Sequence, residues 1–316
     1  MSRKRKQSIS RNGPVTKKIY DQAKRHWQLY LLVLPAFLYI ILFAYKPMSG
    51  LLIAFQDYSL KKGIWGSEWV GFGNFSRLFR SYWFPIILKN TLQISVLSLL
   101  IGFPFPIILA LSANELKSER TKKIFQTISY APHFISTVVI CGMITLFLNP
   151  DAGIINMGIK MLGMDSVYFM QKSDLFKWVY VVSDIWQHSG WGAVIYFAAL
   201  SGVDKELLES AQIDGANRLQ RIRYINFPVL VPTIIIMLIL QCGQLLSVGY
   251  EKVYLLQNST NLSGSEVIST YVYKMGLIDK DFAFSTATGL FNSIINAAIL
   301  VIANTISRKV SKSSLW

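Results

Sequence analysis

Residues 201–228 read SGVDKELLESAQIDGANRLQRIRYINFP, and an apolar run flanks this stretch on each side. The Asp214-Gly215 pair near its centre predicts a sharp corner, because glycine adopts the left-handed backbone that commonly ends a helix. The small side chains of Ala211 and Ala216 allow a close approach at this corner. The stretch therefore predicts two short helices joined at Gly215, and we call residues 201–228 the elbow.

The second arm of the elbow carries an apolar stripe with basic residues beside it. Leu219, Ile222 and Ile225 recur at every third position, which indicates one face of a helix. Arg218 and Arg221 lie next to that face. A segment with this order, apolarity and charge is typical of a docking surface for another protein. The alternative is an amphipathic helix that lies in the lipid interface.

The runs around the elbow belong to a larger pattern of membrane-length apolar segments. The 316 residues are 52% hydrophobic and only 16% charged, whereas a soluble domain carries about 25% charged residues. A helix needs roughly 20 apolar residues to cross a bilayer. The segments that qualify are 27–45, 91–111, 124–148, 178–200, 227–248 and 282–306. We therefore expect an all-α polytopic membrane protein with a six-helix transmembrane domain over residues 29–306, kinked at Pro35, Pro104 and Pro106.

The distribution of basic residues predicts the orientation of these helices. More than half of the 32 Lys and Arg residues fall in segments 1–28, 112–123, 201–226 and 307–316. Because basic residues concentrate on the cytoplasmic side, the N-terminal tail 1–28, the elbow and the C-terminal tail 307–316 are expected there. The tail 1–28 orients a retained first helix and attracts anionic headgroups, so we expect no nucleic-acid partner.

The residue types that carry catalysis and metal binding are sparse. Cys141 and Cys242 lie in apolar runs and are expected to be core residues. His26, His133 and His188 fall at different predicted depths, so we expect no catalytic or metal-binding set, with His133 as a helix–helix contact rather than a proton relay. The sequence has no phosphate-binding loop that ends in Gly-Lys-Ser/Thr. We expect neither an enzyme nor a chain that binds a metal or a cofactor.

Polar residues inside the predicted spans are the candidates for a transport path. Asp184 is the one acid within a span, where a charge usually faces a protein interior or a water path. Helical spacing places Gln187, His188 and Trp191 on its face, and carboxylate, amide and tryptophan groups suit a sugar. The candidate path residues are Asp184, Trp186, Gln187, His188, Trp191, Gln241, Gln244, Asn292 and Asn296. Interhelical hydrogen bonds explain the amides equally well, and an aromatic belt explains Trp186 and Trp191.

Two groups of motifs carry a resemblance to a known family. In the elbow and just after it these are Glu209, Ala211, Asp214, Gly215, Ala216, Ile225, Pro228 and Pro232, and the run resembles the cytoplasmic signature of type I ABC-importer permeases. It departs from that signature at Ser210, Ile222 and Phe227. The segments 47–51, 54–58, 71–75, 90–92, 131–136 and 291–293 resemble the carbohydrate subfamily, nearest to the permeases for lipo-oligosaccharides and polysaccharide fragments in Gram-positive bacteria.

The resemblance implies a subunit of a sugar or oligosaccharide importer in a bacterial cell membrane. It implies a homologous second permease, two cytoplasmic ATPase subunits that bind ATP and Mg, and an extracytoplasmic solute-binding lipoprotein. Residues 206–228 would couple this chain, which has no ATPase site of its own, to one ATPase. The implied coupling residues are Glu206, Glu209, Ala211, Asp214, Gly215, Ala216, Arg218, Leu219, Ile222 and Pro228.

Other classes of membrane protein predict different sequences. An ion-driven secondary transporter would show internal repeats and several charges within the membrane. A membrane enzyme would show a cluster of nucleophile and base or of metal ligands. An ABC permease for a solute other than a sugar would share the elbow. The sugar interpretation therefore depends on the subfamily motifs and on the aromatic, amide-rich segment 178–200.

Overall fold

The computed structural model describes residues 24–116, 118–311 and 314–315. These residues form two compact units, which divide between Leu52 and Ile53. Most of the N-terminal tail and part of the C-terminal tail discussed above lie outside the described residues.

The described part of the first unit consists mainly of one long helix, whose last three residues belong to the second unit. α2 (Trp27–Ile40) continues through a π-helical turn, η1 (Ile41–Tyr45), into the 3-10 helix η2 (Lys46–Phe55). Together they form 29 residues of helix, which runs on through Pro35. No side chain of α2 is buried. The first predicted span is therefore a helix that offers an apolar surface on every side.

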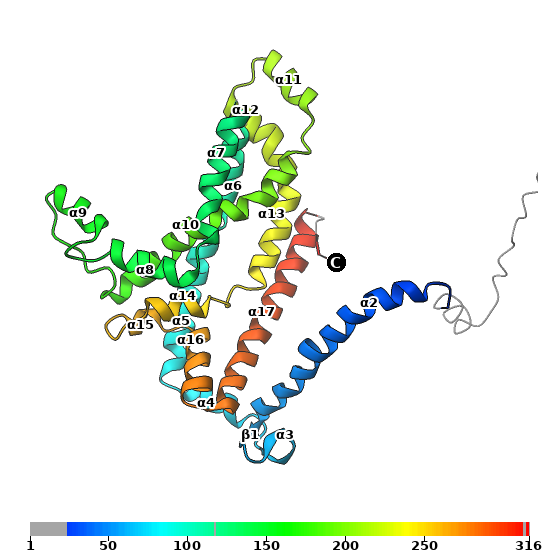
Figure 1. The fold of residues 1–316 in the computed structure, drawn as a ribbon, viewed down its shortest axis with the longest axis vertical. Coiled ribbons are helices and arrows are strands. Elements are labelled where there is room, and N and C mark those ends of the chain that lie inside the picture. The colour runs from blue at the N-terminus through cyan, green and yellow to red at the C-terminus, as the bar shows by residue number, and fades with distance from the viewer. Residues whose placement is uncertain (1–23, 117, 312–313, 316) are drawn as a thin grey trace, which may run out of the picture. The chain divides into compact units, whose positions relative to one another are not determined.

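The second unit begins with a small hairpin and a short helix (Figure 1). Its first elements are β1 (Gln56–Asp57), α3 (Gly63–Gly66), β2 (Glu68–Trp69) and α4 (Gly73–Arg80). The strands are antiparallel, with Gln56 opposite Trp69. The Asn74 side-chain amide donates to the carbonyls of Ala54 and Gln56, both at 3.0 Å. These two hydrogen bonds tie the start of α4 to the end of η2 and to β1.

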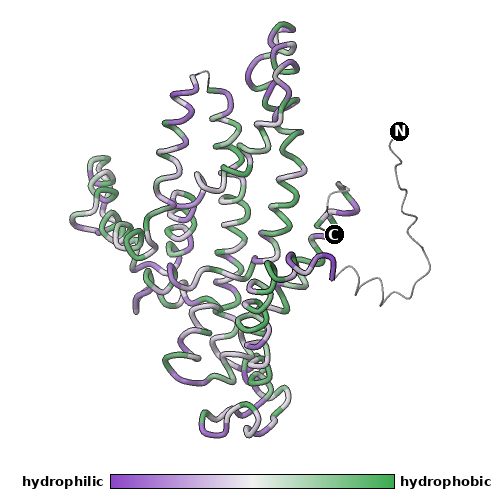
Figure 2. The backbone as a smooth tube through the Cα atoms, turned by 45° about the vertical axis from the view of Figure 1, so that its right-hand side comes forward, coloured by the Kyte–Doolittle hydropathy of each residue, from purple (hydrophilic) through white to green (hydrophobic). Residues whose placement is uncertain are grey.

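Helices make up the remainder of the second unit. In chain order they are α5 (Trp83–Leu97), η3 (Ser98–Gly102), α6 (Pro104–Asn114), α7 (Glu119–Tyr130), η4 (Ala131–Phe134), α8 (Thr137–Phe147), α9 (Ile154–Met161), α10 (Ser173–Leu200), α11 (Lys205–Ile213), α12 (Arg218–Arg221), η5 (Ile222–Asn226), α13 (Phe227–Cys242), α14 (Tyr250–Leu256), α15 (Leu262–Ser265), α16 (Ile268–Tyr273), η6 (Lys274–Ile278) and α17 (Phe282–Ser311). The π-helical turn η3 directly precedes the region of Pro104 and Pro106 in which a kink is expected. Figure 2 shows apolar residues along these helices and more polar ones towards several helix ends.

The candidate membrane spans agree with the prediction in kind but not in number. Within the described residues, Trp27–Phe55, Trp83–Asn114, Arg218–Cys242 and Phe282–Val310 are long and apolar enough to cross a membrane. One bent helix pair brings the total from four to five. The predicted span 178–200 lies in α10, which is not among them because its polar side chains lower its mean hydropathy. The helical membrane fold is confirmed, whereas the count of six spans is not.

The bent pair divides the predicted span 124–148. The helix Glu119–Phe134 and the helix Thr137–Phe147 meet at an angle of 99°. Ile135 between them is extended, and the Ser136 hydroxyl accepts a hydrogen bond from the Val139 amide at the start of α8. The expected continuous helix is therefore interrupted, because a new N-cap starts a second helix within an apolar run whose length alone indicates one.

α10 is the central helix of the second unit. It packs against α5, α6, α7 and α13. At Gly190 the approach to α7 is so close that a Cβ atom would lie 1.9 Å from the Ser129 carbonyl oxygen. Cys141 is buried and Cys242 half-buried, both as free thiols, in agreement with the prediction that they are core residues.

Candidate functional site

The elbow has the local structure that its sequence predicts. The Asp204 side chain caps α11 by accepting from the Glu206 amide at 2.9 Å. Gly215 has φ +81° and turns the chain. Asn217 and Gln220 then exchange side-chain to backbone hydrogen bonds of 2.8 and 2.9 Å, a capping box that starts α12. Each helix end is thus closed by its own residues, and the corner forms without help from a partner.

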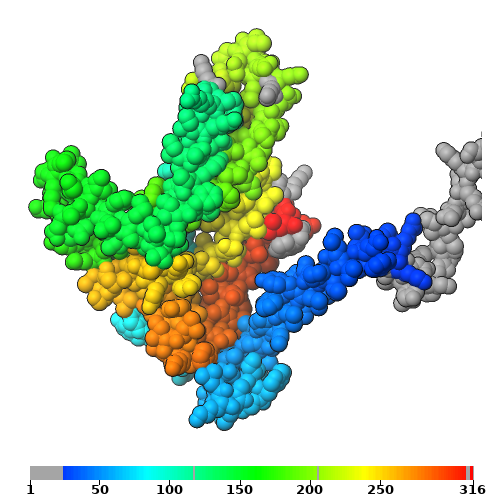
Figure 3. Space-filling view, in the orientation of Figure 1, coloured from blue at the N-terminus to red at the C-terminus, as the bar shows by residue number. Residues whose placement is uncertain are grey.

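The residues predicted to contact an ATPase divide into an exposed and a half-buried group. Exposed are Glu206, Glu209, Asp214, Gly215, Arg218, Leu219 and Pro228, whereas Ala211, Ala216 and Ile222 are half-buried. Ile222 packs inward on the apolar cluster of α6, α10 and α13, so the predicted stripe does not form one docking face. The space-filling view shows the elbow protruding from its unit (Figure 3).

Two exposed apolar residues of the elbow were missed by the sequence analysis. Ile213 is 87% exposed at the end of α11, and Tyr224 is 68% exposed in η5. With Leu219, which is 72% exposed, they offer apolar side chains on a polar loop. The docking surface that the sequence predicts on the elbow therefore includes apolar side chains that the sequence analysis did not name. Ile213 directly precedes the Asp214-Gly215 corner, which was the available signal in the sequence.

The inner side of the elbow is tied to the end of α6. The Glu115 carboxylate accepts from Arg221 Nη2 at 2.6 Å and from Asn226 Nδ2 at 3.1 Å. Arg221 also donates to the Ala216 carbonyl at 3.3 Å. Sequence analysis placed Arg221 beside the docking stripe, but its guanidinium faces inward because the buried Glu115 carboxylate draws it there.

Asp184 on α10 has a partner that the sequence did not reveal. Lys252 on α14 donates to its carboxylate at 3.3 Å, and His188 Nε2 lies 3.7 Å from the same oxygen. The Lys252 side chain is only 6% exposed. Burial lowers the pKa of this lysine, which follows the predicted span 227–248, and the Asp184 carboxylate opposes that shift. The pair places opposite charges together where an unpaired charge would be costly.

The expectation that the three histidines stay apart is wrong for two of them. His133 Nδ1 and His188 Nδ1 are 3.1 Å apart. The His133 ring also stacks on Trp191, with centroids separated by 4.9 Å. His133 lies in the 3-10 turn η4, which packs against α10. The contact with His188 therefore depends on the break in the helix, and the prediction of a continuous span did not include that break.

The candidate side chains of α10 do not share one surface. Asp184 and His188 line a cavity of about 240 Å³ together with Gln241 of α13. Gln187 is buried, and its amide lies 3.4 Å from the Ile135 carbonyl. Trp186 lines a separate apolar groove with residues of α8 and α9. Only part of the predicted set therefore meets around one polar space.

The amides of α17 contribute more to structure than to that cavity. Asn296 accepts from the Leu246 amide at 2.9 Å and donates to the Ser247 hydroxyl at 3.0 Å. These bonds join α17 to the chain segment that follows α13. For Asn296 they agree with the alternative that the amide serves hydrogen bonding between helices. Asn292 has a buried Oδ1 without a partner among the described residues, and Gln244 is exposed.

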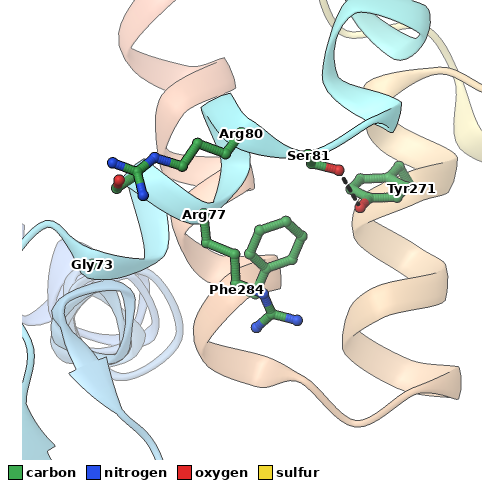
Figure 4. A pocket seen from close by; sticks show the side chains of 7 residues that line it. Gly73, Arg77, Arg80, Ser81, Tyr271 and Phe284 are labelled. Atoms are coloured by element: carbon green, nitrogen blue, oxygen red, sulfur yellow. Dashed lines mark hydrogen bonds between the residues drawn. The ribbon is translucent and has the colours of Figure 1, made fainter.

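A basic pocket of about 520 Å³ lies between α4, α16 and α17 (Figure 4). Arg77 pairs with Asp281 at 2.6 Å and covers the Phe284 ring at 4.6 Å. Arg80 also lines the pocket, and the Ser81 and Tyr271 hydroxyls lie 3.4 Å apart. α4 and the elbow are at opposite ends of the second unit (Figure 1).

The described residues hold no group of three or more His, Cys, Asp and Glu side chains suited to a metal ion. The contacts above are ion pairs, hydrogen bonds and aromatic stacking. They suit the binding of a polar solute and the transmission of movement between helices.

Comparison with known proteins gives relatives that match nearly the whole chain. Protein LplB of Bacillus subtilis (strain 168) is 42% identical, over 93% of this chain and 92% of the relative. The polygalacturonan/rhamnogalacturonan transport system permease protein YteP of the same organism is 41% identical, over 91% of this chain and 90% of the relative. The arabinooligosaccharides transport system permease protein AraP of Halalkalibacterium halodurans is 28% identical, over 83% and 81% of the two chains.

A solved structure and a family model agree with these relatives. A chain of a bacterial alginate ABC transporter, in complex with alginate pentasaccharide-bound periplasmic protein, matches with a TM-score of 0.87 and 40% identity, over 94% of this chain and 100% of that chain. Residues 102–312 match the model for the binding-protein-dependent transport system inner membrane component, a stretch that contains the elbow and most of the residues that line the Asp184 cavity. The chain therefore belongs to the family of binding-protein-dependent transport system inner membrane components, as the elbow motif predicted.

Proposed function

We propose that the chain forms half of the translocation path of an ATP-driven importer for an oligosaccharide. The observation that carries the proposal is an ordered elbow that exposes Ile213 and Leu219 to solvent, in a chain that matches sugar-importer permeases over nearly its whole length. The other half of the path would be a homologous second permease. The family match favours this function over an ion-driven secondary transporter.

The elbow would seat in a cleft of a cytoplasmic ATPase subunit. Exposed apolar side chains at Ile213, Leu219 and Tyr224 supply the contact area, while Asp214 and Arg218 supply charge. ATP and Mg would bind to the two ATPase subunits and not to this chain. The chain would therefore change conformation in response to movements of the ATPase. The elbow and both chain termini would then lie in the cytoplasm, as the positive-inside pattern predicts.

The sugar would pass the cavity lined by Asp184, His188 and Gln241. A carboxylate and an amide accept hydrogen bonds from sugar hydroxyls, and the exposed face of Trp191 suits the apolar side of a sugar ring. We assign Gln187 and Asn296 to helix packing, because their amides bond to neighbouring chain segments. An extracytoplasmic binding lipoprotein would deliver the sugar at the end of the unit opposite to the elbow.

The test is to purify the tagged chain from its native membrane in mild detergent and to identify the accompanying proteins. We expect a second permease and an ATPase. The complex, in vesicles with its binding protein, should then take up either oligogalacturonides from digested polygalacturonan or neutral arabino-oligosaccharides. Uptake driven by an ion gradient without ATP would contradict the proposal. ATP-driven uptake of a non-sugar solute alone would contradict the proposed oligosaccharide substrate but not the proposed ATP-driven import.

A further inference from the structure

Glu115 joins two parts of the chain that are far apart in sequence. It is the C-cap residue of α6, whereas its partners Arg221 and Asn226 belong to α12 and η5, the part of the elbow that leads into α13. One carboxylate oxygen accepts from Arg221 at 2.6 Å and the other accepts from Asn226 at 3.1 Å. A single side chain thus holds the elbow at two points.

The π-helical turn η5 makes this two-point contact possible. Arg221 and Asn226 are five residues apart, a spacing that places side chains on different sides of an α-helix. In a π turn the backbone bonds join residues five apart, as the Phe227 amide does with the Ile222 carbonyl. The widened turn therefore brings both donors to the same side, where one carboxylate can accept from both.

The contact is largely shielded from water. The Glu115 and Arg221 side chains are 11% and 15% exposed, and Asn226 is fully buried. Asn226 Oδ1 has no partner within the described residues, although an unsatisfied buried polar group is normally unfavourable. The hydrogen bond from Asn226 Nδ2 to Glu115 offsets the unfavourable burial of the Asn226 Oδ1 atom.

This contact differs in kind from the apolar packing around it. Ile222 also packs against the cluster that joins α6, α10 and α13, but apolar contacts are non-directional and permit helices to slide. Two hydrogen bonds to one carboxylate fix the position of the elbow relative to the end of α6. A displacement of the elbow is then transmitted to the helix Trp83–Asn114 as well as to α13, which continues directly from η5.

We propose that Glu115, with Arg221 and Asn226, is a positioning residue for energy coupling, which makes the helix Trp83–Asn114 move together with the elbow. The inference rests on the proposed function, because it assumes that an ATPase moves the elbow. In this arrangement one ATPase movement acts on two membrane helices. Without Glu115 the ATPase would still bind and hydrolyse ATP, but less of its movement would reach the transport path.

The experiment compares uptake with ATP hydrolysis in the reconstituted complex. Glu115→Gln keeps the shape of the side chain and removes its charge. Glu115→Gln with Arg221→Gln removes the pair without leaving a buried charge unpaired. For both we expect phosphate release and the amount of bound ATPase to stay within about twofold of wild type, while oligosaccharide uptake per ATP falls about tenfold, an ordinary size for coupling between sites. Glu119→Gln is the matched control, an exposed acid in the same cytoplasmic segment.

Several results would overturn the inference. An unchanged ratio of uptake to ATP hydrolysis in both variants would do so, as would an equal fall in the Glu119→Gln control. A proportional loss of uptake, hydrolysis and bound ATPase, or failure of both variants to assemble, would assign Glu115 a purely structural role. Failure of the proposed function is separate, because the wild-type chain itself would then bind no ATPase or take up neither oligosaccharide probe.

Discussion

Gly215 determines the angle of the elbow at the scale of a single residue. Its φ of +81° is a backbone conformation that glycine adopts at little cost and that a β-branched residue adopts rarely. A Cβ atom there would meet no other atom within 4 Å. The constraint at this position is therefore backbone strain and not crowding.

Gly215→Val should abolish uptake while the protein still inserts into the membrane, because strain of about 1–2 kcal/mol disfavours the corner. Gly215→Asn is the control, since asparagine tolerates this backbone region. Uptake and membrane levels measured together test the prediction. Normal uptake by the valine variant would show that the angle of the elbow is not required.

Asp184 contacts both a basic partner and the cavity. Its carboxylate lies 3.3 Å from Lys252 and lines the space shared with His188 and Gln241. A structural ion pair and a sugar ligand therefore predict different results when both charges are removed. The pair alone requires only that no charge is left buried and unpaired.

Asp184→Asn should lower uptake by roughly tenfold or more, the size expected for one hydrogen bond to a charged group. Asp184→Asn also leaves Lys252 without its charge partner, which should lower the amount of protein in the membrane. The double variant Asp184→Asn, Lys252→Met should restore that amount but not the rate of uptake. Initial uptake rates over a range of sugar concentrations provide the measurement. Full recovery of uptake in the double variant would assign the pair to structure alone.

At the scale of elements, the close contact of α10 with α7 holds the broken helix in place. Gly190 permits this contact, whereas a Cβ atom added at Gly142 in α8 would meet no other atom within 4 Å. The two glycines therefore form a matched pair, one at a crowded and one at an open position in a helix.

Gly190→Ala should lower the melting temperature of the detergent-solubilised protein and reduce its amount in the membrane, because the added methyl group meets backbone atoms of α7. Overpacking of this kind typically costs about 1–3 kcal/mol. Gly142→Ala should be neutral or slightly stabilising, by up to about 1 kcal/mol. Equal melting temperatures for the two variants would contradict the observed packing of α7 on α10.

The elbow as an element presents its apolar residues outward. Ile213→Asp should reduce the amount of ATPase that co-purifies by at least about tenfold, as expected for a residue at the centre of an interface. Leu60→Asp is the control, at a 67% exposed position far from the elbow in sequence. Quantitative immunoblotting of the purified complex measures the effect. If the Ile213 variant recovers as much ATPase as the wild type, Ile213 is not part of the surface that docks on the ATPase.

At the scale of the whole molecule, many apolar side chains of the described residues are exposed. The residues of α2 are exposed throughout, and Val33, Ile108 and Val301 are each more than 50% exposed. A water-soluble monomer rarely exposes apolar side chains along a whole helix, as α2 does. The acyl chains of a bilayer would cover such surface, which agrees with an inner membrane component.

The isolated chain should therefore show no ATP hydrolysis above a detergent blank, because its sequence has no phosphate-binding loop. Phosphate release measured before and after addition of the partner ATPase is the test. Magnesium-dependent hydrolysis that stays with the chain through further purification would contradict the proposed division of tasks.

The sequence by itself determined the features that depend on neighbouring residues. Apolar length predicts spanning segments because the bilayer sets it, and the Asp214-Gly215 corner forms because backbone freedom and helix caps are local. The interruption at Ile135 was not predicted. The length of an apolar segment does not show that Ser136 within it caps the start of a new helix.

Only the tertiary structure decided which distant side chains meet. Glu115 with Arg221, Asp184 with Lys252 and His133 with His188 are separated by 106, 68 and 55 residues. Periodicity assigns a residue to a face of its own helix, but the angle and offset between helices decide what lies opposite. The sequence could therefore place the Asp184 carboxylate on a helix, whereas helix packing gave it a lysine partner and a cavity.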